Sequence, residues 1–291
     1  MAIDILINGL ATSGMYALLA VGFALIFSVA RILNMAHTAF YMIAAFFLYI
    51  GTSLYKMGFL PSSAIAVVLT VILGVVCYKL FFERVKEHEQ TVMIISIALA
   101  MLAQEIFMLI FGGTYRGIDP IISGYSEFGE GTRISNQHIF AIISTSVILL
   151  CMWLWLSKTR LGNAIRAVAQ DAEIANVMGI DDRKICIIVM AVSIFLAGIS
   201  GILMAPIGMV HPLMWSQPIV VVLSAVILGG MGSVGGALIG AVILGYVETI
   251  VTFLLPGGVF LGAPFSLLIM VIVLMIRPEG LFGLFFEEER L

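Results

Sequence analysis

Charge is what this sequence has least of. Only 11% of its 291 residues are Asp, Glu, Lys or Arg, whereas 62% are hydrophobic, and the mean hydropathy is +1.18. A soluble domain carries about 25% charged residues, so this inventory cannot cover a water-facing surface. The sequence therefore predicts an integral membrane protein with several spans. The lipid bilayer is its first expected partner, and no nucleic-acid partner is expected.

Cysteine and histidine are also scarce. The three cysteines, Cys77, Cys151 and Cys186, are odd in number and lie in or next to apolar runs. This placement predicts small packed residues and not disulfides or metal ligands. The four histidines are scattered along the chain, which disfavours a metal site because metal ligands come in clusters.

The sequence also lacks the motifs of a nucleotide-hydrolysing or catalytic site. It has no Gly-rich phosphate loop followed by Lys and Ser or Thr, and no paired catalytic residues. We therefore expect a non-enzymatic chain with no cofactor of its own. The N-terminus carries no basic flank, and its apolar run continues to about Val29. That run is too long for a signal-peptide core, so we expect it to remain as a span.

Apolar runs of membrane length are what the sequence has in abundance. A spanning helix needs about 20 apolar residues. Nine runs qualify: 5–29, 36–55, 61–81, 92–111, 138–156, 187–209, 217–231, 234–255 and 260–276. The fold class is therefore predicted to be all-α, a polytopic transmembrane protein of about eight or nine spans that include broken helices. Residues 1–291 form one transmembrane domain. The pair within 217–255 is the least secure, because the Gly-rich stretch 229–236 can lie inside the membrane.

The basic residues predict the orientation. When the loops are assigned alternately to two sides, all but three of the 14 Lys and Arg residues fall on one side. The three exceptions are Lys56, Arg116 and Arg133. Because cytoplasmic loops collect Lys and Arg, we expect an external N-terminus and a cytoplasmic C-terminus, with residues 158–186 in the cytoplasm. The long loop 112–137 is then external, either as a docking surface or as a passive connection.

Residues 158–186 are the only long polar stretch in the second half of the chain. Four apolar residues recur there with helical spacing: Ile165, Val168, Ala172 and Ala175. Asp171 can cap a second short helix, and Gly179 can end it in the left-handed conformation. The pattern predicts one or two small amphipathic helices outside the bilayer, with a solvated loop as the alternative.

Two polar or Gly-rich interruptions break the spanning sequence. The first holds Asn34 and His37, three residues apart between two apolar runs, and the second holds Gly232 and Ser233. Broken helices of this kind expose backbone groups to a transport path. Ionisable residues inside spans are also functional candidates. Glu248 lies in 234–255 and Glu105 in 92–111, and each can line a path or pair with a neighbouring helix.

Four ordered blocks resemble one family. They are GLATSGMYALLAVGFALIFSVARILNMAHTAFYM (9–42), LGNAIRAVAQDAEIANVMGID (161–181), VILGGMGSVGGALIGAVILGYVE (226–248) and RPEGLFG (277–283). Together they make the chain similar to the permease subunits of bacterial branched-chain amino-acid ABC importers. One departure is Thr38, where the family motif Asn-x-Ala-His-Gly has Gly. A β-branched residue cannot replace Gly where φ is positive, so the resemblance is weakest at this position.

The resemblance implies roles for particular residues. The stretch 158–186 would be a coupling loop that docks into an ATPase subunit. Its expected coupling residues are Arg160, Gly162, Ile165, Arg166, Val168, Asp171, Ala172, Ala175, Met178 and Gly179. The expected pathway residues are Asn34, His37, Gly232, Ser233 and Glu248.

The function that follows is an ATP-driven importer permease in the bacterial inner membrane, working by alternating access on branched-chain or related amino acids. The expected partners are a second homologous permease, two ATPases that bind the ATP, and an external substrate-binding protein. Urea or an amide is the alternative substrate. The rival class is an ion- or proton-coupled secondary transporter or channel, which would need several buried ionisable residues.

Overall fold

The structure is a computed structural model that describes residues 2–85, 88–128 and 132–282. Lys86, Gly283 and the tail through Glu287–Glu289 and Arg290 lie outside the described residues. Helices dominate, and one short hairpin is the described sheet. The elements are α1 (Ala2–Ala30), α2 (His37–Tyr49), η1 (Ile50–Leu54), α3 (Phe59–Cys77), η2 (Tyr78–Phe82), α4 (Glu89–Phe111), β1 (Tyr125–Phe128), β2 (Thr132–Ser135), α5 (Asn136–Lys158), α6 (Arg160–Gln170), α7 (Ala172–Val177), α8 (Asp182–Met204), α9 (Ser216–Gly229), α10 (Val234–Leu254) and α11 (Gly258–Ile276).

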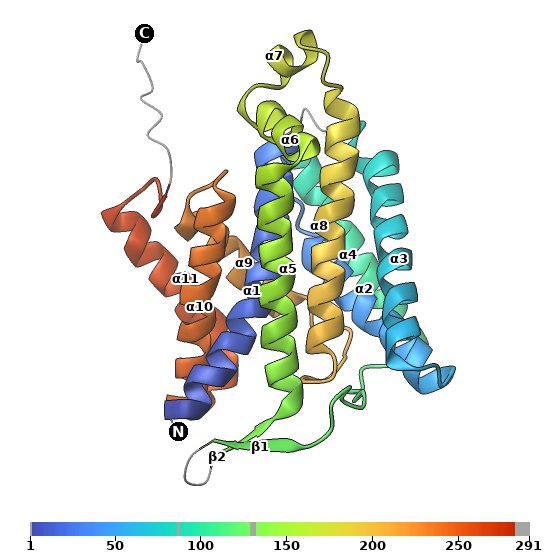
Figure 1. The fold of residues 1–291 in the computed structure, drawn as a ribbon, viewed down its shortest axis with the longest axis vertical. Helices are drawn as coiled ribbons and strands as arrows, with labels where there is room; N and C mark the ends of the chain where they lie inside the picture. The colour runs from blue at the N-terminus through green and yellow to red at the C-terminus, as the bar shows by residue number, and fades with distance from the viewer. Residues whose placement is uncertain (1, 86–87, 129–131, 283–291) are drawn as a thin grey trace.

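Eight helices of the described chain are long and apolar enough to cross a membrane. The prediction of a polytopic all-α protein is therefore confirmed. The span predicted at 217–231 is shorter than expected, because α9 has 14 residues and reaches only about 21 Å at 1.5 Å per residue. Helices α8 and α10 both run away from α6 and α7 (Figure 1), so α9 still returns the chain between them.

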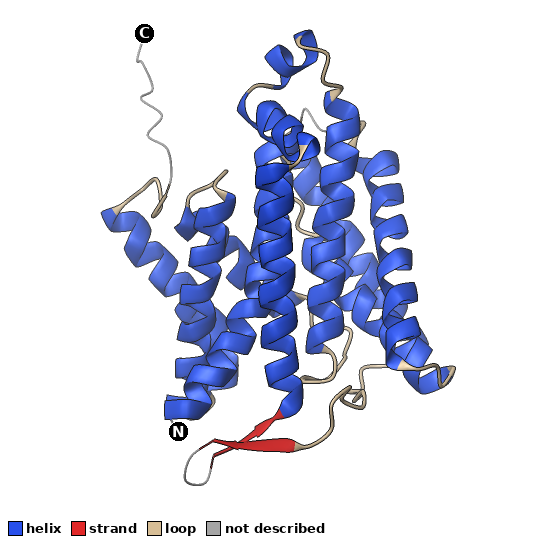
Figure 2. Ribbon diagram, viewed as in Figure 1, coloured by secondary structure: helices blue, strands red, loops and turns tan. Residues whose placement is uncertain are grey.

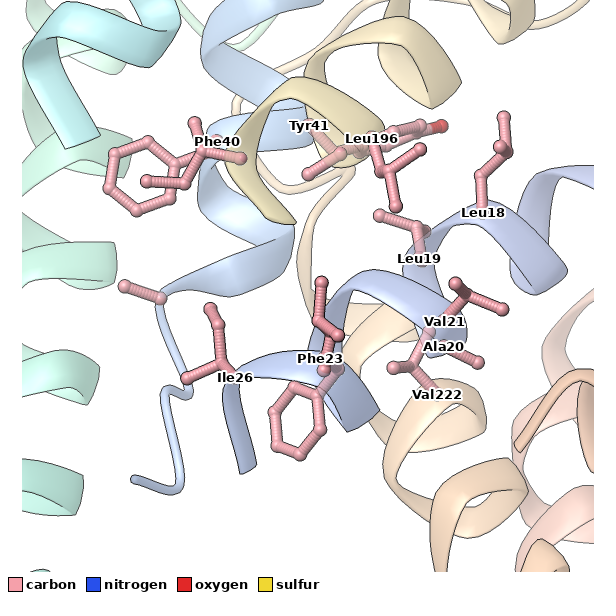
Figure 3. Close-up of a cluster of buried hydrophobic side chains, with 14 of the residues drawn as sticks. Leu18, Leu19, Ala20, Val21, Phe23, Ile26, Phe40, Tyr41, Leu196 and Val222 are labelled. Carbon is pink, nitrogen blue, oxygen red and sulfur yellow. The ribbon is translucent and has the colours of Figure 1, made fainter. Parts of the chain in front are cut away.

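Helix α1 lies at the centre of the bundle. It packs against α5, α8, α9 and α10, and the residues from Tyr16 to Ala20 are at most 2% exposed. Figure 3 shows side chains of α1 surrounded by Phe40 and Tyr41 of α2, Leu196 of α8 and Val222 of α9. Helices α4, α5 and α11 instead lie at the periphery, with most of their length exposed.

Small residues allow the central helices to approach one another. A Cβ on Gly201 of α8 would meet the carbonyl oxygen of Tyr41 at 2.2 Å, and one on Gly245 of α10 would meet the Ser13 backbone at 2.6 Å. Both glycines therefore allow close helix packing. The prediction that all three cysteines are packed is wrong for Cys151, which is exposed on α5 and faces outward. None of the three is in a disulfide.

The two ends of the bundle differ in structure. The N-terminal end of α1 and the β1–β2 hairpin lie at one end, and α6 and α7 project from the other (Figures 1 and 2). The described part of the loop 112–137 contains a hairpin, in which Tyr125–Phe128 pairs antiparallel with Thr132–Ser135. Arg116 ties the loop to the bundle through backbone bonds with Val210 and a 2.9 Å bond to the Tyr49 hydroxyl.

Candidate functional site

The polar stretch 158–186 folds into two capped helices, as its residues predict. Thr159 Oγ1 accepts a hydrogen bond from the N–H of Gly162 at 3.0 Å and so begins α6. Asp171 Oδ1 accepts from the N–H of Ile174 at 2.9 Å and begins α7. Gly179 has a φ of +87° and turns the chain toward α8. The predicted cap at Asp171 and the left-handed exit at Gly179 are both confirmed.

Helix α6 is held tightly against the membrane domain. A Cβ on Gly162 would meet the carbonyl oxygen of Leu156 at 2.1 Å, so only Gly fits there. The same carbonyl oxygen accepts a hydrogen bond from Arg166 at 2.9 Å.

At the start of α8, Lys184 forms an ion pair with Asp181 at 3.0 Å, and this contact lowers the pKa of the exposed Asp181 carboxyl group.

The apolar face predicted for these helices is covered by other parts of the same chain. Ile165, Val168 and Ala175 are 2–3% exposed and belong to the chain's own hydrophobic core, and Ala172 packs against it. Helix α6 reaches this core because it packs on α1, α5 and α8. Sequence periodicity identifies an apolar face but cannot say what covers it. The expectation that this face is available to an outside partner is therefore corrected.

A second apolar surface on the projecting helix is free. Ile174 is 63% exposed, Val177 87% and Met178 78%. We call these three residues the docking tip. Met178 was expected to contribute to coupling, whereas sequence reasoning missed Ile174 and Val177. Their i, i+3, i+4 spacing could have revealed them. Of the other expected coupling residues, Arg160, Arg166, Asp171 and Gly179 are exposed on the same projection.

The first interruption carries the chain back into the bundle. Helix α1 ends at Ala30, and Arg31 adopts a φ of +53°, which is uncommon for a residue other than Gly. Residues 31–36 then return along α1, because His37 at the start of α2 contacts Leu19. At about 1.5 Å per residue, Leu19 lies roughly 17 Å below the end of α1. Helix α2 therefore begins deep inside the membrane domain.

Asn34 and His37 hold this interruption in place. Asn34 Oδ1 accepts from the N–H of Ala36 at 3.1 Å, and the Asn34 backbone carbonyl accepts from the N–H of His37 at 3.1 Å. The His37 ring lies 3.1 Å from the Leu19 carbonyl oxygen and 3.3 Å from Ser193 Oγ. His37 thus joins α1, α2 and α8. Both residues are at most 1% exposed.

The departure at Thr38 has a physical explanation. Thr38 lies inside helix α2 and is not among the described residues with positive φ. The position therefore does not require Gly, and a β-branched residue fits. Two buried polar atoms at the interruption, Asn34 Nδ2 and Thr38 Oγ1, have no hydrogen-bond partner within the described chain.

The second interruption lies where α9 meets α10. Gly230 and Gly232 have φ values of +100° and +94°, and Ser233 caps α10 by accepting from the N–H of Gly236 at 3.0 Å. Ser28 of α1 donates to the Gly232 carbonyl at 2.9 Å. The turn therefore lies near the α6 end of α1 and not at mid-membrane depth.

Glu248 lies on α10 among uncharged groups from other helices. Gln217 Nε2 of α9 donates to Glu248 Oε1 at 2.8 Å, and the Tyr16 hydroxyl of α1 lies beside the same carboxyl group. Glu105 differs, since it is exposed on α4 and accepts from its neighbour Gln104 at 3.1 Å. Of the two ionisable candidates, only Glu248 faces the interior.

The described chain is a helical bundle with a capped projection at one end. The solved structure of PsaBC from Streptococcus pneumoniae in complex with Fab has a similar fold, with a TM-score of 0.52 and 12% identity. The match covers 94% of this chain and 92% of that one. At this identity the likeness shows the fold alone.

Sequence comparison gives the family. Residues 5–277 match the profile described as "Branched-chain amino acid transport system / permease component". The chain belongs to this family, and its function is that of a permease component. The alternative of an ion-coupled secondary transporter or channel finds no support in this match.

Relatives with similar sequences match over most of their length. The chain is 27% identical to the high-affinity branched-chain amino acid permease BraD of Pseudomonas aeruginosa, covering 96% of this chain and 94% of BraD. It is 24% identical to LivH of Escherichia coli, covering 95% and 94%. The ribose import permease RbsC of Haemophilus influenzae is 25% identical, with 85% and 81% covered.

Proposed function

We propose that this chain is the membrane-spanning subunit of an ATP-driven importer for branched-chain or related amino acids in the bacterial inner membrane. The observation that carries the proposal is the docking tip on a capped projection of a permease-family bundle. The near full-length relatives named for branched-chain amino acids support the substrate class. The relative named for ribose import shows that the substrate varies among similar chains.

The docking tip fits an ATPase partner. Three large apolar side chains at 63–87% exposure stand on and directly after α7, which projects beyond the apolar bundle. An exposed apolar cluster of this kind marks a contact with another protein. The chain has no phosphate loop of its own, so an ATP-driven transport cycle needs a partner that binds ATP. A second homologous permease would supply a second projection, giving two ATPases per complex.

A path connects the projection to the interior. Helix α6 is buried against α1, α5 and α8, and the Arg31 guanidinium lies 3.5 Å from the Ala169 carbonyl oxygen of α6. Arg31 begins the segment that leads to Asn34 and His37. We expect ATPase closure to move α6 and, through Arg31, the start of α2. Such a movement would alternate access between the two sides.

The distribution of the basic residues supports a cytoplasmic docking tip. Lys158, Arg160 and Arg166 lie at the α6 end, whereas Lys56 and Arg116 lie near the hairpin end, as cytoplasmic enrichment of Lys and Arg requires. The hairpin end then faces outward, where an external substrate-binding protein would dock. Single cysteines at Asp171 and Gly124 test this orientation. A membrane-impermeant thiol reagent should label intact cells at position 124 only.

The test of the proposal is Val177→Asp. Docking buries Val177, so a charge there should reduce ATPase binding by about 2 kcal/mol or more, a hot-spot loss. We expect normal membrane levels, loss of copurifying ATPase and loss of amino-acid uptake. Glu173→Gln is the matched control on the same helix, because Glu173 is exposed and polar. Ile165→Asp should instead reduce folded protein, since Ile165 is buried in the chain.

Retained ATPase binding and uptake in Val177→Asp would contradict the docking proposal. Equal losses in Val177→Asp and Glu173→Gln would show that any change on α7 is harmful, which would also contradict a specific apolar contact.

A further inference from the structure

Glu248 is a half-buried acid, and no cation lies beside its carboxyl group among the described residues. Its Oε1 atom accepts from Gln217, whereas Oε2 is buried and has no hydrogen-bond partner within the described chain. The side chains that act on the carboxyl group, Tyr16 and Gln217, are uncharged. A second hydroxyl, that of Tyr41 on α2, lies within electrostatic range of the carboxylate. A charge in such a position is costly unless a counter-charge or proton joins it.

This carboxyl group lies inside the membrane domain. Tyr16 is at the centre of the 29-residue helix α1, and Glu248 is the fifteenth of the 21 residues of α10, in the half nearer the hairpin end. Transporter substrate sites commonly lie near the bilayer midplane and between interrupted helices. Tyr41 belongs to α2, which follows the first interruption, and Glu248 belongs to α10, which follows the second. Tyr41 connects the site to the first interruption, whereas the second lies at the opposite end of α10, near the α6 end of α1.

The packing fixes the carboxyl group in this place. A Cβ on Gly262 of α11 would lie 2.5 Å from Glu248 Cγ, so α11 closes directly over the stem of the side chain. The charged end is therefore directed toward the α1, α2 and α9 side, where the hydroxyls and the amide lie. With Oε2 unpartnered, the carboxyl group keeps one buried acceptor atom free for a donor from a ligand.

We infer that Glu248, with the Tyr16 and Tyr41 hydroxyls, receives the ammonium group of the amino acid as it crosses the membrane. An ammonium group brings three donors and one positive charge, which suit a carboxyl group that has one free acceptor atom and only uncharged groups acting on it. This inference rests on the proposed function and names the part of the substrate that the membrane domain itself recognises. Gln217 acts as a positioning residue, because its amide holds Oε1 and leaves Oε2 for the ligand.

Binding to the purified complex of permeases and ATPases, without the external binding protein, tests the inference. The probe is radiolabelled L-leucine. The competitors are 3-methylbutylamine, which has the ammonium group without the carboxylate, and 4-methylpentanoate, which has the reverse. We expect the amine to compete with leucine in the wild-type complex and the acid to compete at least about tenfold more weakly, since a bond to a charged group accounts for such a factor. Stronger competition by the acid would overturn the inference without any substitution.

Glu248→Gln removes the charge and keeps the shape. We expect leucine affinity per assembled complex to fall at least about tenfold and competition by the amine to disappear, whereas Glu248→Asp should retain part of both. Wild-type affinity in assembled Glu248→Gln complex would overturn the inference and make the carboxyl group a structural one. A fall in the yield of complex with unchanged affinity would do the same.

The inference and the proposed function fail in different measurements. A wild-type complex that takes up no amino acid would contradict the proposed function and, with it, the ammonium assignment. A wild-type complex that imports leucine, beside a Glu248→Gln complex that binds and imports it equally well, would contradict the ammonium assignment alone.

Discussion

Helices α1 and α11 are both strongly apolar, but α1 is buried at the centre of the bundle and α11 lies exposed at its periphery. The mean hydropathy of the α1 span is 2.0 and that of α11 is 2.8, yet 89% of the first and 11% of the second is buried. The more apolar helix is the less buried one. In a bilayer an apolar surface is needed wherever lipid is touched, whereas an interior helix needs small residues and hydrogen-bonding groups that fit its neighbours. Hydropathy therefore finds the spans but does not rank them by depth.

The largest expected effect tests whether close contact at the centre matters more than apolarity. Gly201→Ala places a Cβ 2.2 Å from the Tyr41 carbonyl oxygen, whereas Gly198→Ala on the same helix meets no atom nearer than 3.6 Å. Overpacking costs about 1–3 kcal/mol. We expect Gly201→Ala to lower the thermal unfolding midpoint in detergent and Gly198→Ala to leave it unchanged. Equal unfolding midpoints for the two variants would contradict the claim that close contact between the central helices stabilises the bundle.

A second effect concerns transport through the interior. Asn34→Leu removes the acceptor for the Ala36 N–H and leaves that buried donor unpaired, at about 1–3 kcal/mol. We expect the complex to assemble and uptake to fall. A substitution on the periphery, Leu268→Ala on α11, should change neither quantity, because Leu268 is 52% exposed. Unchanged uptake in Asn34→Leu would make Asn34 a packing residue only.

The smallest effect lies on the projection. In Gly179→Ala the new Cβ meets no atom within 4 Å, but a residue with a side chain must adopt a backbone φ of +87°. This conformation costs about 1 kcal/mol. We expect a small loss of ATPase copurification, measured at limiting ATPase. Gly117→Ala is the control, since it also has open space and its φ is not positive. Identical behaviour of both variants would show that the exit from α7 needs no left-handed residue.

Much of the fold could be predicted because its signals are local. Length and apolarity identify the membrane helices in the sequence. The caps at Asp171 and Gly179 follow from the side-chain acceptor of Asp and from the left-handed conformation that Gly allows. Helix α9 was placed correctly but predicted two residues too long at its end, because Gly230 turns the chain. The burial of Ile165 and Val168 could not be predicted, because it depends on packing against α1, α5 and α8. The spacing of Ile174, Val177 and Met178 could have indicated the exposed apolar surface.

The candidate interior site shows the same limit. Asn34, His37 and Glu248 could be chosen from the sequence as polar residues within spans. Their partners could not be predicted, because they are distant in sequence. His37 contacts Leu19 and Ser193, and Glu248 contacts Tyr16 and Gln217. The position of Thr38 also needed the structure, which shows it inside a helix. Long-range packing decides these contacts, and a single sequence does not carry that information.

The measurement that tests the account most directly is photocrosslinking from the projection in intact membranes. A photoreactive amino acid replaces Val177 in one variant and Tyr125, exposed on the β1 strand at the opposite end, in the other. The account predicts an adduct between the chain and the ATPase from position 177 and none from position 125. An ATPase adduct from position 125, or its absence from 177 in a transporting complex, would contradict it.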